Sequence, residues 1–241
     1  MKIVDYIAST IDRFSKGYIF TYSDFETDVR NKEAVIKCLN RMVASGKIQK
    51  LAKGKYYKPE SSAFGALPPL QYQVVKDLLE RNGKTTGYIT GFGAYNELGL
   101  TTQVSNTIQI GRNEIKPSIK RGIYKIAFAK QKNKITKENI PLLKILDSIR
   151  YVKSIPDTTI DNSCSRLQAI LKKLSYTERE LIIKLSMLYP PSTRALLGAL
   201  IERDIEKKKI EAIRKSLNPI TIYKLSVSEN VLPNAKNWNI I

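Results

Sequence analysis

The sequence of 241 residues contains no histidine, and its only two cysteines are Cys38 and Cys164. Without histidine, the chain lacks the base of Ser-His-Asp and Cys-His catalysis and the histidine ligands of zinc sites. Two isolated cysteines are typical of a reducing cytoplasm and make no metal site. We therefore expect a protein that is not an enzyme, with no catalytic residues, no bound metal and no cofactor.

Long apolar runs are also missing, since none approaches the roughly 18 residues that a membrane span needs. The first residues, MKIVDYIASTIDRF, include two acids and no small-residue cleavage site, so we do not expect a signal peptide. Acidic residues are scarce, because 22 Asp and Glu stand against 41 Lys and Arg, giving a net charge of +19. This excess predicts a cytoplasmic protein with an anionic partner, nucleic acid before a membrane surface.

The clearest order of elements lies in residues 23–59, SDFETDVRNKEAVIKCLNRMVASGKIQKLAKGKYYKP. Ser23 and Glu26 form a capping box that predicts a helix to about Val29, and Asn31 is a suitable N-cap for a second helix. Gly46 should end the second helix. The apolar stripe expected on this helix consists of Ala34, Val35, Cys38, Leu39 and Met42.

Two short strands, 48–51 and 55–57, should then form a hairpin across residues 52–54. This order of helix, turn, helix and hairpin is that of a winged helix-turn-helix. From Lys32 to Lys58, eight Lys or Arg residues stand against one acid, Glu33, which favours DNA binding. A solvated basic face is the alternative. Of the two wing tyrosines, Tyr56 and Tyr57, one should pack and the other reach a phosphate or stack.

The rest of the chain predicts an α+β protein with a mixed α/β C-terminal domain whose helices are concentrated late. A helix over 3–14 and a strand over 18–20 that can pair with the hairpin complete a winged helix-turn-helix domain at 1–60, followed by a linker at 61–69 and a C-terminal domain at 70–241. The apolar stripe expected on this first helix consists of Ile3, Val4, Ile7, Ile11 and Phe14. The other expected elements are helices at 70–81 (with Tyr72, Val75, Leu78 and Leu79 on its apolar face), 141–152 (with Pro141 in its first turn), 163–174, 177–188 (capped by Thr177 with Glu180) and 192–201 (capped by Ser192), and strands at 86–90, 107–110, 123–128 and 220–225.

Three local motifs are weak candidates for chemistry. Residues 82–85, NGKT, end like a phosphate-binding loop but lack its first glycine, and a helix-ending glycine explains them better. Gly91 and Gly93 lack the third glycine of a dinucleotide fingerprint, which favours tight packing at a strand-to-helix turn. Carboxylates at 157, 161 and 206 fit a solvated face better than a metal site.

Three segments resemble the AbiEi-type antitoxins of type IV toxin–antitoxin (abortive infection) systems of bacteria. They are GKIQKLAKGKYYKP at 46–59, GYITGFGAYNELGLTTQVSNTIQI at 87–110 and YPPSTRALLGALIE at 189–202. The resemblance implies a winged-helix repressor of its own operon, which binds inverted repeats in double-stranded DNA, and a C-terminal antitoxin domain. The implied toxin is a nucleotidyltransferase-like protein that is countered without a stable complex.

Carried over by residue, the resemblance implies contacts to the DNA groove and contacts from the wing. The implied groove contacts are Lys32, Lys37, Asn40 and Arg41, and the implied wing contacts are Lys50, Lys53 and Lys55. Charge alone suggests further basic positions for the antitoxin activity or for a contact with RNA, namely Lys116, Lys120, Arg121, Lys125 and Arg194.

Two other functions stay open at this point. The first is a winged-helix transcriptional regulator whose C-terminal domain senses a ligand. The second is an RNA- or nucleotide-processing enzyme, against which the missing histidine and the incomplete loop motifs argue.

Overall fold

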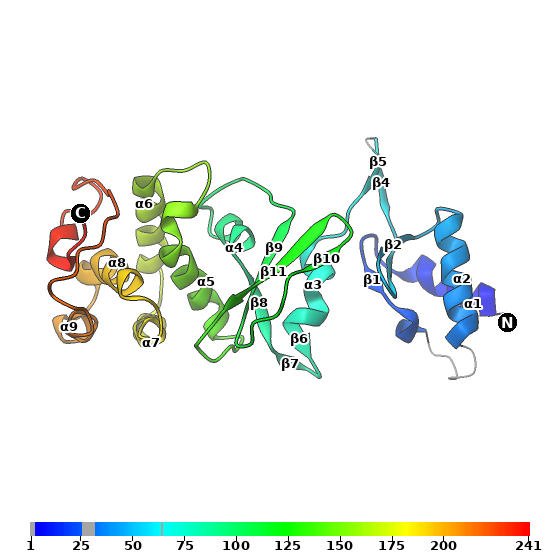
Figure 1. Cartoon of the computed structure of the whole chain (residues 1–241), viewed down its shortest axis with the longest axis horizontal. Coiled ribbons are helices and arrows are strands. Elements are labelled where there is room, and N and C mark those ends of the chain that lie inside the picture. Colours follow the sequence, from blue (N-terminus) through cyan, green and yellow to red (C-terminus); the bar gives the residue numbers. More distant parts are fainter. Residues whose placement is uncertain (1–2, 26–31, 64) are drawn as a thin grey trace. The chain divides into compact units, whose positions relative to one another are not determined.

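The computed structural model describes residues 3–25, 32–63 and 65–241 and has an α+β fold (Figure 1). The predicted helix from Ser23 to Val29 and its capping partner Glu26 fall largely on residues outside this description, as does Asn31. Contacts divide the chain into two compact units. Unit 1 comprises residues 1–78 and 119–125, and unit 2 comprises residues 79–118 and 126–241.

Unit 1 begins with helices and a small sheet, as the sequence predicts. Its elements are α1 (Ile3–Arg13), β1 (Ile19–Phe20), the 3-10 turn η1 (Tyr22–Asp24), α2 (Lys32–Ala44), β2 (Gln49–Ala52) and β3 (Lys55–Tyr57). The three strands form an antiparallel sheet in the order β1-β3-β2, which confirms the predicted pairing of 18–20 with the hairpin. The hairpin turns at Gly54, whose φ of 71° suits glycine.

The core of unit 1 lies between α1, α2 and this sheet. Ile7 and Ile11 of α1 and Val35 and Leu39 of α2 are fully buried there, and Phe20 of β1 joins them. This confirms the apolar stripes predicted for both helices, apart from two residues at their edges. Val4 is 49% exposed and Ala34 is also exposed, because each lies at the margin of its stripe.

The predicted linker at 61–69 is partly ordered, and unit 1 continues beyond it. It contains a hairpin of β4 (Glu60–Ser62) and β5 (Gly65–Leu67), which is followed by α3 (Gln71–Leu79). Tyr124 Oη donates to the Pro69 carbonyl at 3.1 Å, and Arg121 donates to the Val74 carbonyl at 2.5 Å. Unit 1 therefore includes α3 up to Leu78 and residues 119–125, so it extends beyond the predicted boundary at residue 60.

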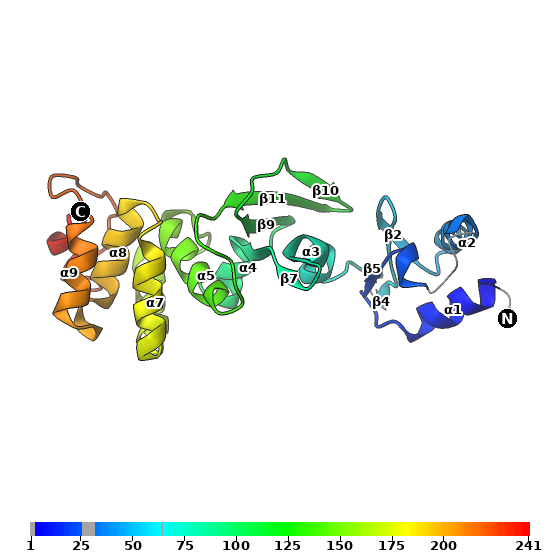
Figure 2. The same cartoon turned by 90° about the horizontal axis from the view of Figure 1, so that it is seen from below.

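Unit 2 starts with strands and a short helix. Its first elements are β6 (Glu80–Arg81), β7 (Lys84–Thr85), β8 (Gly87–Thr90), α4 (Phe92–Glu97), β9 (Thr107–Arg112) and β11 (Tyr124–Lys130). The short strand β10 (Ile119–Arg121) and the start of β11 are assigned to unit 1, and the sheet order is β10-β11-β9-β8. Helix α4 packs on β8 and β9, and Figure 2 shows it on one side of β9.

The later part of unit 2 is helical. Its elements are α5 (Asn139–Arg150), η3 (Val152–Ser154), α6 (Ile160–Lys172), α7 (Tyr176–Ser186), α8 (Pro191–Ile201), η4 (Glu202–Asp204), α9 (Lys207–Lys215) and η5 (Ala235–Trp238). Helix α8 packs against α5, α6, α7 and α9 and is buried over nearly its whole length. This confirms the expectation that helices are concentrated late in the chain.

Several local predictions in unit 2 and α3 were wrong. Helix α7 is capped by Ser175 with Glu178, not by Thr177 with Glu180, and α8 begins at Pro191, one residue before the predicted cap Ser192. Tyr72 was expected on the apolar face of α3 but is 51% exposed, because the helix buries Val74, Val75 and Leu79 instead. Residues 220–225 form no strand; they make one isolated parallel bridge, Tyr223 with Ile240, because among the described residues only 223–226 hydrogen-bond to the backbone of 239–241.

Candidate nucleic-acid interface

The outer face of α2 carries polar and basic side chains because the apolar stripe of this helix is used by the core. Lys32, Lys37, Asn40 and Arg41 are all exposed, as the sequence predicts. Lys32 Nζ lies 4.5 Å from the centroid of the Tyr22 ring, a cation–π contact between α2 and η1. Among the described residues, neither Lys37 nor Arg41 has an ion-pair partner.

Asn40 is held in place from the sheet. Tyr56 Oη of β3 donates to Asn40 Oδ1 at 3.2 Å, and the Tyr56 side chain itself is buried. This bond orients the amide, so that its NH₂ group stays available on the outer face of α2. It also places this face of the helix next to the hairpin.

Only two of the three lysines predicted to contact DNA from the hairpin are free of ion pairs with other described residues. Lys50 and Lys53 are exposed, and neither forms an ion pair with another described residue. Lys55 differs, because its Nζ lies 3.1 Å from Asp77 Oδ2 and its side chain is only 21% exposed. Lys55 is therefore part of the internal structure of unit 1, which the sequence pattern does not reveal.

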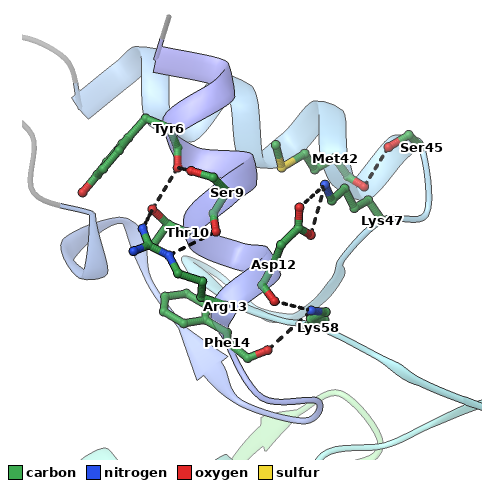
Figure 3. Close-up of polar contacts among 10 residues, drawn as sticks. All are labelled: Tyr6, Ser9, Thr10, Asp12, Arg13, Phe14, Met42, Ser45, Lys47 and Lys58. Carbon is green, nitrogen blue, oxygen red and sulfur yellow. Dashed lines mark hydrogen bonds and ion pairs between the residues drawn. The ribbon is translucent and has the colours of Figure 1, made fainter. Parts of the chain in front are cut away.

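Two further lysines near the hairpin are bound to α1 (Figure 3). Lys47 Nζ lies 3.3 Å from both carboxylate oxygens of Asp12, and Lys58 Nζ donates to the Asp12 carbonyl at 2.9 Å. The surface that remains for a nucleic acid consists of Lys37 and Arg41 on α2 and Lys50 and Lys53 on the hairpin, with Lys32 and Asn40 held beside them.

The prediction for the wing tyrosines was half right. Tyr56 and Tyr57 both pack, with exposures of 4% and 7%, so neither is free to reach a phosphate. Tyr57 Oη donates to Gln49 Oε1 across the hairpin. Burial raises the pKa of both phenols. They fix the hairpin instead of contacting a ligand.

Asp77 of α3 joins three elements of unit 1. Arg121 binds its carboxylate through two hydrogen bonds of 2.6 and 2.9 Å, and Lys55 binds Oδ2. Burial alone would raise the pKa of Asp77, but the two cations hold it below its usual value. Arg121, one of the positions suggested from charge, is 7% exposed and serves this cluster.

We expect Asp77→Asn to lower the free energy of unfolding at pH 7 by about 1–2 kcal/mol. This is less than for a fully buried pair, because the Asp77 side chain is 40% exposed. A carboxyl whose pKa is lowered by folding stabilises above its unfolded pKa, near 3.9, and the stabilisation is lost as pH falls through the folded pKa. In urea unfolding, the free energies of unfolding of the wild type and of Asp77→Asn should therefore converge as the pH falls below about 4. The same loss at pH 3 as at pH 7 would contradict the charge-based explanation, and Glu114→Gln is an exposed control.

Unit 2 contains a second polar cluster, which the sequence pattern does not show. Asp147 of α5 is 8% exposed, and its carboxylate accepts hydrogen bonds from Tyr88 and Thr90 at 2.7 Å and from Tyr189 at 2.8 Å. Gln131 Nε2 donates to both tyrosine oxygens at 2.9 and 2.8 Å, so that both hydroxyl protons are left for the carboxylate.

Burial raises the pKa of Asp147 despite these three donors. It likewise raises the pKa of Tyr88 and Tyr189 above the ordinary value. A cavity of about 290 Å³ adjoins the cluster, lined also by Lys130, Arg150 and Tyr151. Both oxygens of the Asp147 carboxylate accept hydrogen bonds from within the protein, and the cluster joins β8, α5 and the segment just before α8.

The two glycine motifs are turns. Asn82 and Gly83 have φ of 50° and 71° in the tight hairpin between β6 and β7, which is not a phosphate-binding loop. The prediction that Gly83 ends a helix was also wrong, because α3 ends at Leu79 and β6 follows it. Gly91 has φ of 59°, and a Cβ there would lie 1.9 Å from Gln109 Oε1, whereas a Cβ at Gly93 would meet Ile89 at 2.5 Å. Both glycines are required by close packing of the strand-to-helix turn, which confirms the interpretation made from the sequence.

The acidic candidates are not brought together. Asp161 accepts a hydrogen bond from the Ser228 amide at 2.8 Å, and Glu206 precedes α9. Within residues 3–25, 32–63 and 65–241, no three Cys, Asp or Glu residues lie together in a way that could hold a metal ion. A helix able to cross a membrane is likewise not found among these residues.

Of the basic positions suggested from charge, Lys116, Lys120 and Lys125 are exposed, and Arg194 is partly buried.

A family model covers most of both units, from residue 6 to residue 181; the family is DUF6088, a family of unknown function. The chain belongs to this family. No curated protein matches it. It is similar in fold to the crystal structure of RV2827C protein from Mycobacterium tuberculosis, with a TM-score of 0.59 and 12% identity over 93% of this chain and 85% of that chain. At this identity the similarity concerns the fold alone.

Proposed function

We propose that unit 1 is a winged helix-turn-helix that binds double-stranded DNA, and that the protein is a cytoplasmic antitoxin of the AbiEi type that represses its own operon. The observation that carries the DNA-binding part is the exposed face of α2, with the hairpin beside it. Lys37, Arg41, Lys50 and Lys53 project from these two elements without an ion-pair partner among the described residues. The resemblance of the three sequence segments supports the antitoxin part.

The two elements have different roles in this proposal. Helix α2 enters the major groove, where Arg41 and the NH₂ group of Asn40 reach base edges. Lys50 and Lys53 of the hairpin bind phosphates, which adds affinity without sequence preference. Lys55 is bound to Asp77 and is omitted from the proposed contact set, although the sequence resemblance included it.

The first measurement is a binding titration against the DNA upstream of the gene, with a scrambled duplex alongside, at two salt concentrations. Preference for the upstream DNA that persists at the higher salt supports a specific repressor. Equal, salt-sensitive binding to both duplexes would contradict the operator proposal and would mean that the net charge of +19 acts as a general polyanion surface.

The variants Arg41→Ala and Lys53→Ala should behave differently in this titration. Arg41→Ala should cost about 1–3 kcal/mol on the operator and relax the sequence preference. Lys53→Ala should weaken binding to all duplexes alike and flatten the salt slope by about one unit. Lys125→Ala removes the same charge from an exposed position outside α2 and the hairpin and serves as the matched control. Identical behaviour of the Arg41 and Lys53 variants would contradict the assigned roles.

The antitoxin part has its own test. A nucleotidyltransferase-like protein encoded next to this gene should arrest growth when it is expressed alone, and co-expression of this chain should restore growth. Purification of both proteins together should yield no stable complex. Growth arrest that persists in the presence of this chain would leave the ligand-sensing regulator as the better description.

A further inference from the structure

A cavity of about 440 Å³ opens in unit 2 between the end of α5 with η3, the start of α8 and residues 222–225. Its floor is apolar, since five buried side chains line it: Ile149, Val152, Leu196, Leu225 and Ile240. A volume of this size falls in the range of sites that hold a small organic molecule. The proposed DNA contacts in unit 1 do not use any of these residues.

The rim of this cavity is basic. Arg150, Lys153 and Lys224 line it, and among its described lining residues there is no Asp or Glu. Lys153 Nζ donates to the Lys224 carbonyl at 3.0 Å, which fixes residues 222–225 beside η3. The positive charge at this rim is therefore not neutralised by an acid in the cavity, and the cavity attracts an anion.

Helix α8 begins at this cavity. Pro191 opens the helix, and the Pro190 carbonyl accepts the amides of Thr193 and Arg194 at 3.0 and 3.2 Å. No side chain caps the helix, and Ser192 and Thr193 of its first turn line the cavity. The positive end of an 11-residue helix therefore adds to the field of the three basic side chains.

Two buried hydroxyl groups at the cavity lack a partner. Among the residues that the structure describes, Thr193 Oγ1 and Tyr223 Oη form no hydrogen bond, although both residues line the cavity. Thr193 is 1% exposed. Leaving a buried hydroxyl unsatisfied costs about 1–3 kcal/mol, a cost that a ligand oxygen would remove. These two hydroxyls are an observation independent of the helix end and of the charge.

We propose that this cavity binds a phosphate ester with an apolar or aromatic body, of the nucleoside monophosphate class. The phosphate lies at the start of α8, where it accepts hydrogen bonds from the Thr193 hydroxyl and is paired by Lys153 and Lys224. The body of the ligand rests on the apolar floor. The same chemistry is offered by a free nucleotide and by the phosphorylated end of a short RNA, and the experiment separates the two.

The test is isothermal titration calorimetry of the full chain without DNA. The probes are uridine and adenosine monophosphates, a 5′-phosphorylated trinucleotide RNA, inorganic phosphate and the unphosphorylated nucleosides. We expect at least one phosphorylated nucleotide probe to bind tenfold or more tightly than inorganic phosphate and than its nucleoside, because both the rim and the floor contribute. A trinucleotide that binds more tightly than the free monophosphates would assign the site to an RNA end, and the reverse would assign it to a free nucleotide.

Thr193→Val is the decisive variant. Valine has nearly the shape of threonine without the hydroxyl, so we expect affinity to fall about tenfold while the melting temperature stays equal or rises. Lys153→Ala should also weaken binding, whereas Lys173→Ala removes an exposed lysine at the end of α6 and should leave it unchanged. Unchanged affinity in both the Thr193 and Lys153 variants, or no binding of any phosphorylated probe at millimolar concentration, would overturn the proposal. Neither result bears on operator binding, which uses unit 1.

Discussion

Asp147→Ala is expected to lower the free energy of unfolding by about 3–5 kcal/mol. The substitution removes the acceptor of three hydrogen bonds at once and leaves the hydroxyls of Tyr88, Thr90 and Tyr189 buried without it. Each orphaned donor costs about 1–3 kcal/mol, partly relieved when the hydroxyls turn toward other acceptors. Chemical unfolding monitored by circular dichroism measures this loss.

A matched pair of variants makes the interpretation specific. Asp147→Asn keeps the volume and one acceptor oxygen, so its loss should be smaller than that of Asp147→Ala. Glu211→Ala removes an exposed acid from α9 and should change stability by no more than about 0.5 kcal/mol. An Asp147→Ala protein as stable as the wild type would show that the cluster does not hold β8, α5 and α8 together.

The second large effect is expected at Gly198, in the middle of α8. A Cβ at this position would lie 2.2–2.7 Å from three carbons of the Trp238 ring, closer than atoms can approach. Trp238 is 1% exposed, and its Nε1 donates to Glu202 Oε2 at 3.1 Å. Alanine is the better helix former by about 1 kcal/mol, but overpacking of a core costs typically 1–3 kcal/mol or more. We therefore expect Gly198→Ala to be destabilising overall.

The only tryptophan of the chain reports on this clash directly. If the indole is displaced toward water in Gly198→Ala, its emission maximum should shift to longer wavelength. In a Trp238→Ala background, where the obstructing ring is gone, Gly198→Ala should become neutral or stabilising, which a double-mutant cycle followed by circular dichroism will measure. The same penalty in both backgrounds would contradict the assignment of the clash to Trp238.

Elements whose signal lies within a few neighbouring residues could be predicted from the sequence. The stripes of α1, α2 and α5 and the pairing of the hairpin with β1 follow from local periodicity and turn residues. The cap of α7 was misplaced because the sequence SYTERE contains two overlapping capping boxes. Ser175 with Glu178 forms in the structure, and no local rule decides between that box and Thr177 with Glu180.

The candidate site was predictable only in part, since charge can be counted in a sequence but its partner cannot. Lys50 and Lys55 look alike in the hairpin, yet only Lys55 meets Asp77, which lies in a different element. The Asp147 cluster combines residues from β8, from α5, from just after β11 and from just before α8, which no spacing rule connects. Residues 220–225 alternate like a strand, but in the described part of the chain only residues 223–226 meet a partner segment, 239–241, so the pairing is too short to form a strand.

Unit 1 is discontinuous in the chain, because residues 119–125 return to it after forty residues assigned to unit 2. A recombination event that transferred only residues 1–78 to another gene would leave Asp77 without Arg121 and Pro69 without Tyr124. Unit 1 of this chain is therefore inherited whole only when at least the first 125 residues are transferred together.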